Sequence, residues 1–290
     1  VVPFTAGGPT DRVARDLAEA LRKPLGGAVI LVDNAAGAGG SIGASKVAKA
    51  APDGHTLLLA AFGNVVLQPL LSKHGGSDLI AKLKPVSTIS TAPHVLVVSS
   101  KLPIKTVAEL MDYARANPGH ISFASAGTGG TSHLGMEMFK AMSKTDVIHV
   151  PYKGSSGSVN DLISGQVSAL FSSLPSLQGL VDKGYIRVLA ATAPSNTPAT
   201  KSLPLMSAAL PGYEYSTWYA MYAPVATPPA LVDKINQALS RALKNPALIA
   251  KIEPAGTELH AGSPDEVLQW TKRDTEKWAR VIRDAKIAVE

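Results

Sequence analysis

The feature that most constrains the fold is a unit that recurs along the chain: a short apolar run, a loop of glycine and hydroxyl residues, then an amphipathic segment. Val1–Phe4 leads into the loop at residues 5–10, and Ile121–Ala124 leads into Ser125–Ser132. After each loop, apolar residues recur at helical spacing, such as Val13, Leu17 and Leu21. Alternating strands and helices of this kind predict an α/β fold with mainly parallel sheets.

Most other elements follow from the same pattern. Further strands are expected at residues 28–32, 56–61, 94–98, 147–150, 167–171, 186–191 and 217–223. Thr106 and Glu109 have the spacing of a capping box, and helices are also expected at 228–243 and 264–287. Residues 72–85 and 192–212 are polar or rich in proline and predict loops.

Length and composition exclude several classes of protein. The 290 residues indicate two domains or one large one, and 46% apolar with 17% charged residues excludes disorder. The absence of cysteine excludes disulfide scaffolds and thiol catalysis. The sequence has no uninterrupted apolar run of the roughly 20 residues that a spanning helix needs. The 28 basic and 22 acidic residues are spread thinly, which argues against nucleic acid as a partner.

Motifs for nucleotides, metals and catalysis are weak. The chain has no Walker loop, and the seven histidines lack metal-ligand spacing, so neither a cofactor nor a metal is expected. Residues 39–43 match Gly-x-Ser-x-Gly, but eight residues separate Ser41 from Val32, where the preceding apolar run ends. A nucleophile elbow directly follows its strand. We therefore expect Ser41 to cap a helix, with a serine hydrolase as the alternative.

The two glycine loops carry the strongest chemical signal. A helix N-terminus presents unpaired backbone N–H groups and a partial positive charge, and glycine allows a ligand to approach the backbone closely. Hydroxyls of Thr10, Ser125, Thr131 and Ser132 add donors. Because the two loops lie in separate halves of the chain, we expect an anion such as a carboxylate to be held from both sides.

Five sequence blocks resemble those of one known family. They are VVPFTAGGPTDRVARDLAEAL, VDNAAGAGGSIGASKVAKAAPDGHTLLLA, FASAGTGGTSHLGMEMF, VIHVPYKGSSGSVNDLISGQVSALF and PGYEYSTWYAMYAP. Together they are similar to Bug/TctC-type periplasmic solute-binding proteins of tripartite tricarboxylate transport systems. The resemblance implies a type II periplasmic binding protein, a monomer with two α/β lobes that close on a small carboxylate. It also implies a membrane transporter as partner and an N-terminal signal peptide preceding this sequence.

The resemblance also implies a division into lobes and a set of ligand-binding residues. Lobe 1 comprises residues 1–98 and 222–290, lobe 2 comprises 99–221, and the crossing strands are His94–Val98 and Thr217–Ala223. The implied ligand-binding residues are Phe4, Ala6, Gly7, Gly8, Thr10, Asp11, Phe62, Gly63, Asn64, Ser125, Gly127, Thr131, Ser132 and Ser172.

Several of these residues have competing roles. Thr10 and Asp11 suit the first turn of a helix, and Phe62 suits the core. His133 suits hydrogen bonding within lobe 2. Tyr152 and Lys153 suit either the rim of the site or the solvated surface, with Lys153 as a possible carboxylate partner.

One departure from the family pattern bears on the ligand. Members that resemble amino-acid binders have an aspartate just before a Leu-Pro-Ser sequence, but residues 170–176 here contain no carboxylate. We therefore expect a carboxylate without an amino group: a di- or tricarboxylate, or an aromatic carboxylate. The expected activity is binding with domain closure and no catalysis. A transferase that uses the second loop, and a sensing or scavenging binder without transport, are the alternatives.

Overall fold

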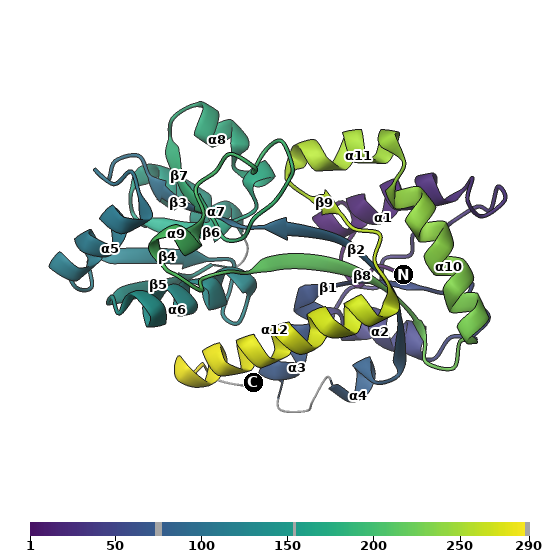
Figure 1. The fold of residues 1–290 in the computed structure, drawn as a ribbon. Helices are drawn as coiled ribbons and strands as arrows, with labels where there is room; N and C mark the ends of the chain where they lie inside the picture. The colour runs from purple at the N-terminus through teal and green to yellow at the C-terminus, as the bar shows by residue number, and fades with distance from the viewer. Residues whose placement is uncertain (73–76, 153–154, 288–290) are drawn as a thin grey trace.

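The computed structural model describes residues 1–72, 77–152 and 155–287 and contains two sheets side by side (Figure 1). The first is four-stranded with the order β1-β8-β2-β9, and the second is five-stranded with the order β5-β4-β6-β3-β7. Helices flank both sheets, which confirms the α/β, two-lobed class. Each sheet with its helices is called a half of the molecule below.

The first half is built around β8, which pairs with β1 and β2. The strands are β1 (Leu58–Ala61), β2 (Leu83–Pro93), β8 (Ser216–Pro224) and β9 (Glu258–Leu259). One face carries α1 (Pro9–Leu21), α10 (Pro229–Leu243) and α11 (Pro246–Ile252), which contribute to a core with Leu17, Ile89 and Leu239. The other face carries α2 (Ser41–Ala48), α3 (Gln68–Leu71) and α12 (Pro264–Asp284). A short helix, α4 (Ser77–Ile80), precedes β2.

The second half is formed by chain between the two crossings. Its strands are β3 (Val95–Ser99), β4 (Ile121–Ser125), β5 (Val147–Pro151), β6 (Ala169–Ser172) and β7 (Ile186–Ala191). Its helices are α5 (Val107–Ala116), α6 (Thr131–Ser143), α7 (Ser155–Ser164), α8 (Gln178–Asp182) and α9 (Met206–Ala209). The rings of Phe123, Phe139 and Phe171 pack together in its core.

The prediction of mainly parallel sheets was wrong. All strand pairs of the first sheet are antiparallel, and in the second only β4 is parallel to its neighbours β5 and β6. The reason is the crossing of the chain between halves. β2 carries it toward the second half and β8 brings it back, so the two long strands run in opposite directions and pair antiparallel.

The crossings meet at His94, between β2 and β3. The His94 N–H donates to Thr192 Oγ1 at 2.9 Å, the Thr192 N–H donates to the His94 carbonyl at 2.9 Å, and the Tyr215 N–H donates to the Thr192 carbonyl at 3.0 Å. Burial lowers the pKa of His94 to about 4, so its ring is neutral at pH 7. The lobe limits at 98/99 and 221/222 stay a prediction. Because β3 belongs to the second sheet, we propose His94 as the first crossing.

The structure also corrects several local predictions. Ala28–Val32 forms no strand; Val29 and Leu31 are 77% and 83% exposed, and pairing is limited to a bridge from Val2 to Asn34. The proposed loop at 72–85 contains α4 and the start of β2. Pro85 is tolerated inside that strand because the register shifts between Pro85 and Ser87.

Helix starts give a mixed outcome. The capping box is confirmed, since the Glu109 N–H donates to Thr106 Oγ1 at 3.1 Å. Thr10 and Ser41 do not cap their helices, because the N-caps are Gly8 and Gly40 and neither cap makes a side-chain hydrogen bond.

Candidate functional site

The first loop, Phe4–Asp11, is braced by one carboxylate. Asp11 accepts hydrogen bonds from the Gly7 N–H at 2.8 Å, from Arg15 Nε at 2.9 Å and from Asn34 Nδ2 at 3.0 Å. Asn34 Nδ2 also donates to the Phe4 carbonyl at 3.1 Å. Asp11 thereby ties both ends of the loop to the segment at Asn34, and its side chain is occupied by protein groups.

The charge of Asp11 is strongly favoured. The hydrogen bonds from Arg15 and from the Gly7 N–H lower the pKa of Asp11 to about 2. The carboxylate is therefore ionised throughout the neutral range. Thr10 is buried in the same turn, and its Oγ1 lies 3.4 Å from the Tyr219 hydroxyl, so it joins the loop to β8.

The second loop, Ser125–Ser132, connects β4 to α6 and is braced by hydroxyls. Ser125 Oγ accepts from the Gly127 N–H at 3.3 Å, and Ser132 Oγ accepts from the Ala126 N–H at 3.3 Å. The Gly130 N–H donates to the Gly127 carbonyl at 3.3 Å. Both serines therefore hold the loop's backbone, while Thr131 stands half-buried at the first position of α6.

Two histidines that sequence reasoning did not place in the site lie behind this loop. His149 Nε2 is 2.6 Å from Ser125 Oγ, and the His149 ring stacks on His133 with centroids 3.9 Å apart. The Gly129 N–H donates to His133 Nδ1 at 3.0 Å, and His133 Nε2 lies 3.7 Å from Glu137 Oε1. His149 reaches the loop through tertiary pairing, because β5 lies parallel beside β4 and aligns Ser125 with Pro151, two residues beyond His149.

The remaining predicted residues lie in two other places. Phe62 is 1% exposed, and its ring packs against Trp218 and Trp278 at centroid distances of 5.9 and 6.0 Å. Phe62 therefore has the core environment that the sequence offered as its competing role, and its role as a ligand-binding residue stays a prediction. Gly63 begins a π-helical turn. Ser172 ends β6, with its hydroxyl 3.2 Å from that of Ser176.

Asn64 serves the glycine segment before α2. Its Oδ1 accepts from the Ala61 N–H at 3.1 Å, and its Nδ2 donates to the Gly39 carbonyl at 2.6 Å. A side chain at Gly40 would collide with Asn64, because a Cβ there would lie 2.0 Å from Nδ2. Asn64 thus links the segment before α2 to the end of β1 through its two side-chain hydrogen bonds.

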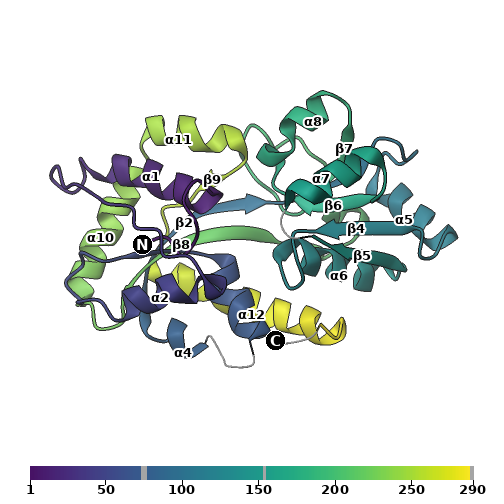
Figure 2. The same cartoon turned by 180° about the vertical axis from the view of Figure 1, so that it is seen from behind.

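Each of the two loops leads into a helix whose N-cap is glycine. α1 and α6 begin with glycine N-caps, Gly8 and Gly130, and neither makes a side-chain capping bond. By contrast, α5 and α12 are capped by the hydroxyls of Thr106 and Ser263. A helix start without a side-chain cap leaves its first N–H groups for another acceptor. Figure 2 shows that α1 and α6 come from opposite halves of the molecule.

The second loop also touches the first half directly. A Cβ placed on Gly129 would lie 2.8 Å from Leu71 Cδ1, so the loop backbone packs against the end of α3. Gly129 has a φ of +76°, which a side chain would strain. Lys153, considered as a carboxylate partner, lies outside the described residues. Tyr152 is half-buried, and its hydroxyl bonds to Asp161.

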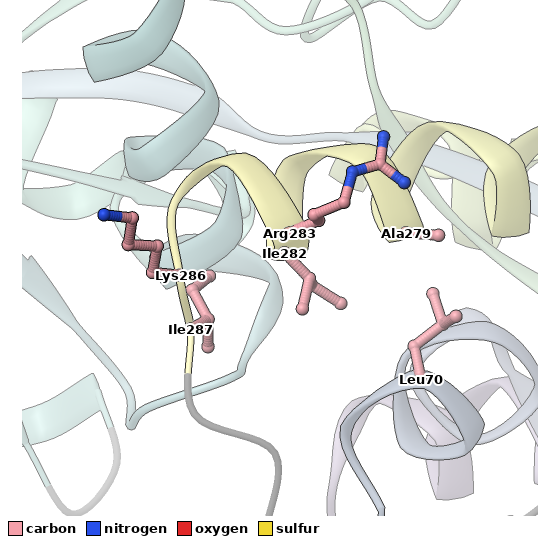
Figure 3. Close-up of a pocket in the computed structure, with 6 residues that line it drawn as sticks. All are labelled: Leu70, Ala279, Ile282, Arg283, Lys286 and Ile287. Carbon is pink, nitrogen blue, oxygen red and sulfur yellow. The ribbon is translucent and has the colours of Figure 1, made fainter.

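Two pockets lie away from the predicted site. One, of about 390 Å³, lies between α3 and the end of α12, where Leu70 points toward Ala279 and Ile282 (Figure 3). The other, of about 360 Å³, lies beside α2 and is lined by Ser41, Ile42, Ser45, Lys46 and Lys49. Among the described residues, no histidine lines this second pocket.

Neither a metal cluster nor a membrane-spanning helix is found among the described residues. Within residues 1–72, 77–152 and 155–287, no cluster of three or more histidine or acidic side chains is arranged to hold a metal ion. Among the described helices, none has both the length and the apolar character needed to span a bilayer. What the two loops offer is a pair of helix N-termini with backbone donors and hydroxyls, an arrangement suited to a small anion.

Comparison with known sequences identifies close relatives. The family described as "Tripartite tricarboxylate transporter family receptor" (TctC) matches residues 13–287. A UPF0065 protein from the tcbD-tcbE intergenic region of Pseudomonas sp. strain P51 is 35% identical over 287 residues, which cover 97% of this chain and 84% of that protein. BugT of Bordetella pertussis is 32% identical over 290 residues, covering 98% and 87%.

Solved structures agree with the sequence comparison. Rpa4515 of R. palustris with adipate superposes with a TM-score of 0.84 at 34% identity, covering 99% of this chain and 96% of that one. The periplasmic binding protein BugD has a TM-score of 0.79 at 32% identity, covering 99% and 96%. MatC from Rhodopseudomonas palustris with bound malate has a TM-score of 0.78 at 28% identity, covering 97% of each chain.

Proposed function

Since this chain belongs to the TctC family of tripartite tricarboxylate transporter receptors, we propose that it is a periplasmic binding protein that captures a small carboxylate between its two glycine loops. The captured ligand is then delivered to a membrane transporter. The protein binds and releases the ligand and does not transform it. We expect it to act as a monomer.

The observation that carries this proposal is the pair of glycine-capped helix starts in opposite halves. The N–H groups in the first turns of α1 and α6 lack a side-chain cap, and each helix start carries a partial positive charge. One carboxylate oxygen pair is the natural acceptor for such donors. The proposed direct contacts are the backbone at Ala6, Gly8 and Thr10 on one side, with Thr131 and Ser132 on the other.

Other predicted residues take supporting roles in this proposal. Asp11 and Gly7 shape the first loop, Ser125 and Gly127 shape the second, and Asn64 holds the segment before α2. Phe4 anchors the first loop through its carbonyl. Gly63 and Ser172 are proposed as more distant contacts that sense the far end of the ligand.

The ligand class follows from two lines of support. Rpa4515 is described with adipate and MatC with malate, and both ligands are dicarboxylates without an amino group. Residues 170–176, where amino-acid binders are expected to carry an aspartate, contain hydroxyls and no carboxylate. We therefore favour a dicarboxylate over a tricarboxylate or an aromatic acid.

The proposed mechanism is closure about the crossings. Hydrogen bonds among His94, Thr192 and Tyr215, two between backbone groups and one to the Thr192 hydroxyl, join the two crossing segments. A ligand that touches both loops only when the halves approach shifts the population toward the closed form. The transporter would then read that form.

Isothermal titration calorimetry against adipate, malate, citrate, benzoate, aspartate and glutamate tests the proposal. We expect stoichiometric binding of a dicarboxylate without turnover. Thr131→Ala should weaken it by about 1–3 kcal/mol if the hydroxyl donates to a buried anion. Lys140→Ala, on the same helix, is the matched control. Binding of aspartate or glutamate alone would overturn the ligand class, and unchanged affinity in both Thr131→Ala and Ser132→Ala would overturn the site.

A further inference from the structure

Behind the second loop lies a polar cluster that the proposed contacts do not use. It consists of Ser125 on β4, His149 on β5, and His133 with Glu137 on α6. Ser125 is 3% exposed and His149 is half-buried. The hydroxyl of Ser125 lies within 2.6 Å of His149 Nε2, the shortest of its contacts, so the imidazole determines how that hydroxyl is directed.

We propose that His149 is a positioning residue for the Ser125 hydroxyl and makes ligand capture proton-linked, so that the site takes up a proton when a carboxylate binds. This inference rests on the proposed function, because it places the carboxylate at the second loop. When Nε2 of His149 carries no proton, it accepts from the Ser125 hydroxyl. When His149 is protonated, Nε2–H donates to Ser125 Oγ, and the hydroxyl proton turns to the Gly127 carbonyl of the loop, 3.2 Å away.

The two stacked rings are held differently. His133 Nδ1 accepts the Gly129 N–H at 3.0 Å, and His133 Nε2 faces Glu137 Oε1 at 3.7 Å, so both nitrogens of this ring have partners. His149, whose ring centroid lies 3.9 Å from that of His133, meets the loop through the Ser125 hydroxyl, which can either donate or accept. His149 can therefore take up a proton while the bond from Gly129 to His133 is kept.

Within the part of the chain that the structure describes, few charged groups lie around His149. From α6 come His133, Glu137 and, beside Glu137, Lys140, and from β4 comes Ser125. The adjacent strand residues Ile148 and Val150 carry no charge. Tyr152, farther along the chain, bonds to Asp161 of α7.

The direction of the linkage follows from these groups. Burial and the neighbouring His133 lower the pKa of His149 to about 4, while Glu137 acts in the opposite direction. A carboxylate bound at the second loop adds a second negative charge near the His149 ring and raises the proton affinity of that ring. By linkage, the protonated ring raises the affinity for the carboxylate, so binding tightens as the pH falls from 7.5 toward 5.

Calorimetry with adipate and malate at pH 7.5, 6.5, 5.5 and 5.0 tests this inference. His149→Gln keeps a side-chain amide in reach of Ser125 but cannot take up a proton. Ligand ionisation is common to all variants, so the ratio of wild-type to His149→Gln affinity isolates the histidine. We expect a ratio within about threefold at pH 7.5 that grows by about three- to tenfold at pH 5.0. His120→Gln, at an exposed position in the same half, should follow the wild type.

Titration in two buffers of different ionisation enthalpy gives a second readout. Wild type should take up a fraction of a proton per ligand at pH 5.0, and His149→Gln should take up less. His149→Leu, which removes the hydrogen bond as well, should bind more weakly at every pH. Equal pH dependence in wild type and His149→Gln would overturn this inference alone. Failure of every carboxylate to bind wild type at any pH would overturn the proposed function and this inference with it.

Discussion

The two glycine loops present the same backbone device but are held by different chemistry. In the first loop, a permanently charged Asp11 gathers Gly7, Arg15 and Asn34 around one carboxylate. In the second, serine hydroxyls and histidine rings hold the backbone, with Ser125 against His149 as the closest contact. The first loop is thus held by hydrogen bonds to one charged residue. The second is held by hydrogen bonds shared among several serine and histidine side chains.

Because they are held differently, the two loops should respond differently to mutation and to acid. A loop that depends on one carboxylate collapses when that carboxylate is removed and is insensitive to mild acid. A loop held by several neutral groups tolerates the loss of one of them but responds to protonation of an imidazole.

The largest effect is expected from Asp11→Ala. It removes three acceptor contacts and leaves the Gly7 N–H and Arg15 without their partner, so the first loop loses its shape. Carboxylate affinity should fall by about tenfold or more in calorimetry. Glu19→Ala, at an exposed ion pair on the same helix, is the control and should bind normally. An Asp11→Ala protein with wild-type affinity would refute the single-centre view of this loop.

A smaller effect is expected from alanine at the loop glycines. Gly129→Ala places a side chain at φ +76° and 2.8 Å from Leu71 Cδ1, so it should destabilise the protein by about 1–2 kcal/mol. Gly8→Ala has an ordinary φ of −74° and only a 3.5 Å contact with the Thr5 carbonyl, so it should fold normally. Urea denaturation compares the two. Leu71→Ala combined with Gly129→Ala should recover the steric part of the loss, and equal stability of Gly8→Ala and Gly129→Ala would contradict this account.

Acid should reach the second loop before the first. The pKa of His149, lowered to about 4 by burial and His133, means that its stabilisation is complete above about pH 6.5 and is lost as the pH falls from 6.5 to 4. The pKa of Asp11, about 2, means that its stabilisation persists to about pH 4 and is lost between pH 4 and 2.

The amide resonances of Gly127 and Gly7 report on the two loops in a pH titration followed by NMR. We expect the Gly127 signal to move with a midpoint near pH 4 and the Gly7 signal to move only at lower pH. In His149→Gln, the Gly127 transition should disappear. A Gly7 signal that moves at higher pH than the Gly127 signal would contradict the expectation that acid affects the second loop before the first.

The smallest effect is expected where the helix start has its own cap. Thr106→Ala removes the hydroxyl that accepts the Glu109 N–H at the exposed start of α5, at a cost of about 1 kcal/mol in stability. Carboxylate affinity should be unchanged, because this helix start is used structurally. A loss of binding in Thr106→Ala would mean that capped and uncapped helix starts do not differ in function as argued.

The fold was largely predictable because its strands and helices carry strong local patterns. β4, β7 and α12 occur where apolar runs and periodicity predicted them. The sequence did not predict β2, because Pro85 and several hydroxyl residues interrupt the apolar pattern expected of a strand. Its pairing partner, β8, is distant in the sequence. Ala28–Val32 has the composition of a strand, but among the described residues the structure shows no neighbouring strand paired with it. Local composition cannot reveal whether such a neighbour exists.

The site was predictable in part. Glycine spacing located both loops, because φ values such as +81° at Gly7 demand glycine. The partners of Asp11 and Ser125 were not predictable, since Asn34 and His149 reach them through tertiary packing. Phe62 illustrates the same limit, because an aromatic side chain suits a cleft wall and a core equally until Trp218 and Trp278 are seen around it.

The crossing of the chain at His94 also has a consequence for biosynthesis. The strands of the second sheet all lie between Val95 and Ala191, so that sheet can assemble as soon as this stretch has left the ribosome. The first sheet must wait for β8 at Ser216–Pro224, and its cover is incomplete until α12 ends at Asp284. The half of the molecule whose translation begins first is thus the last to be completed.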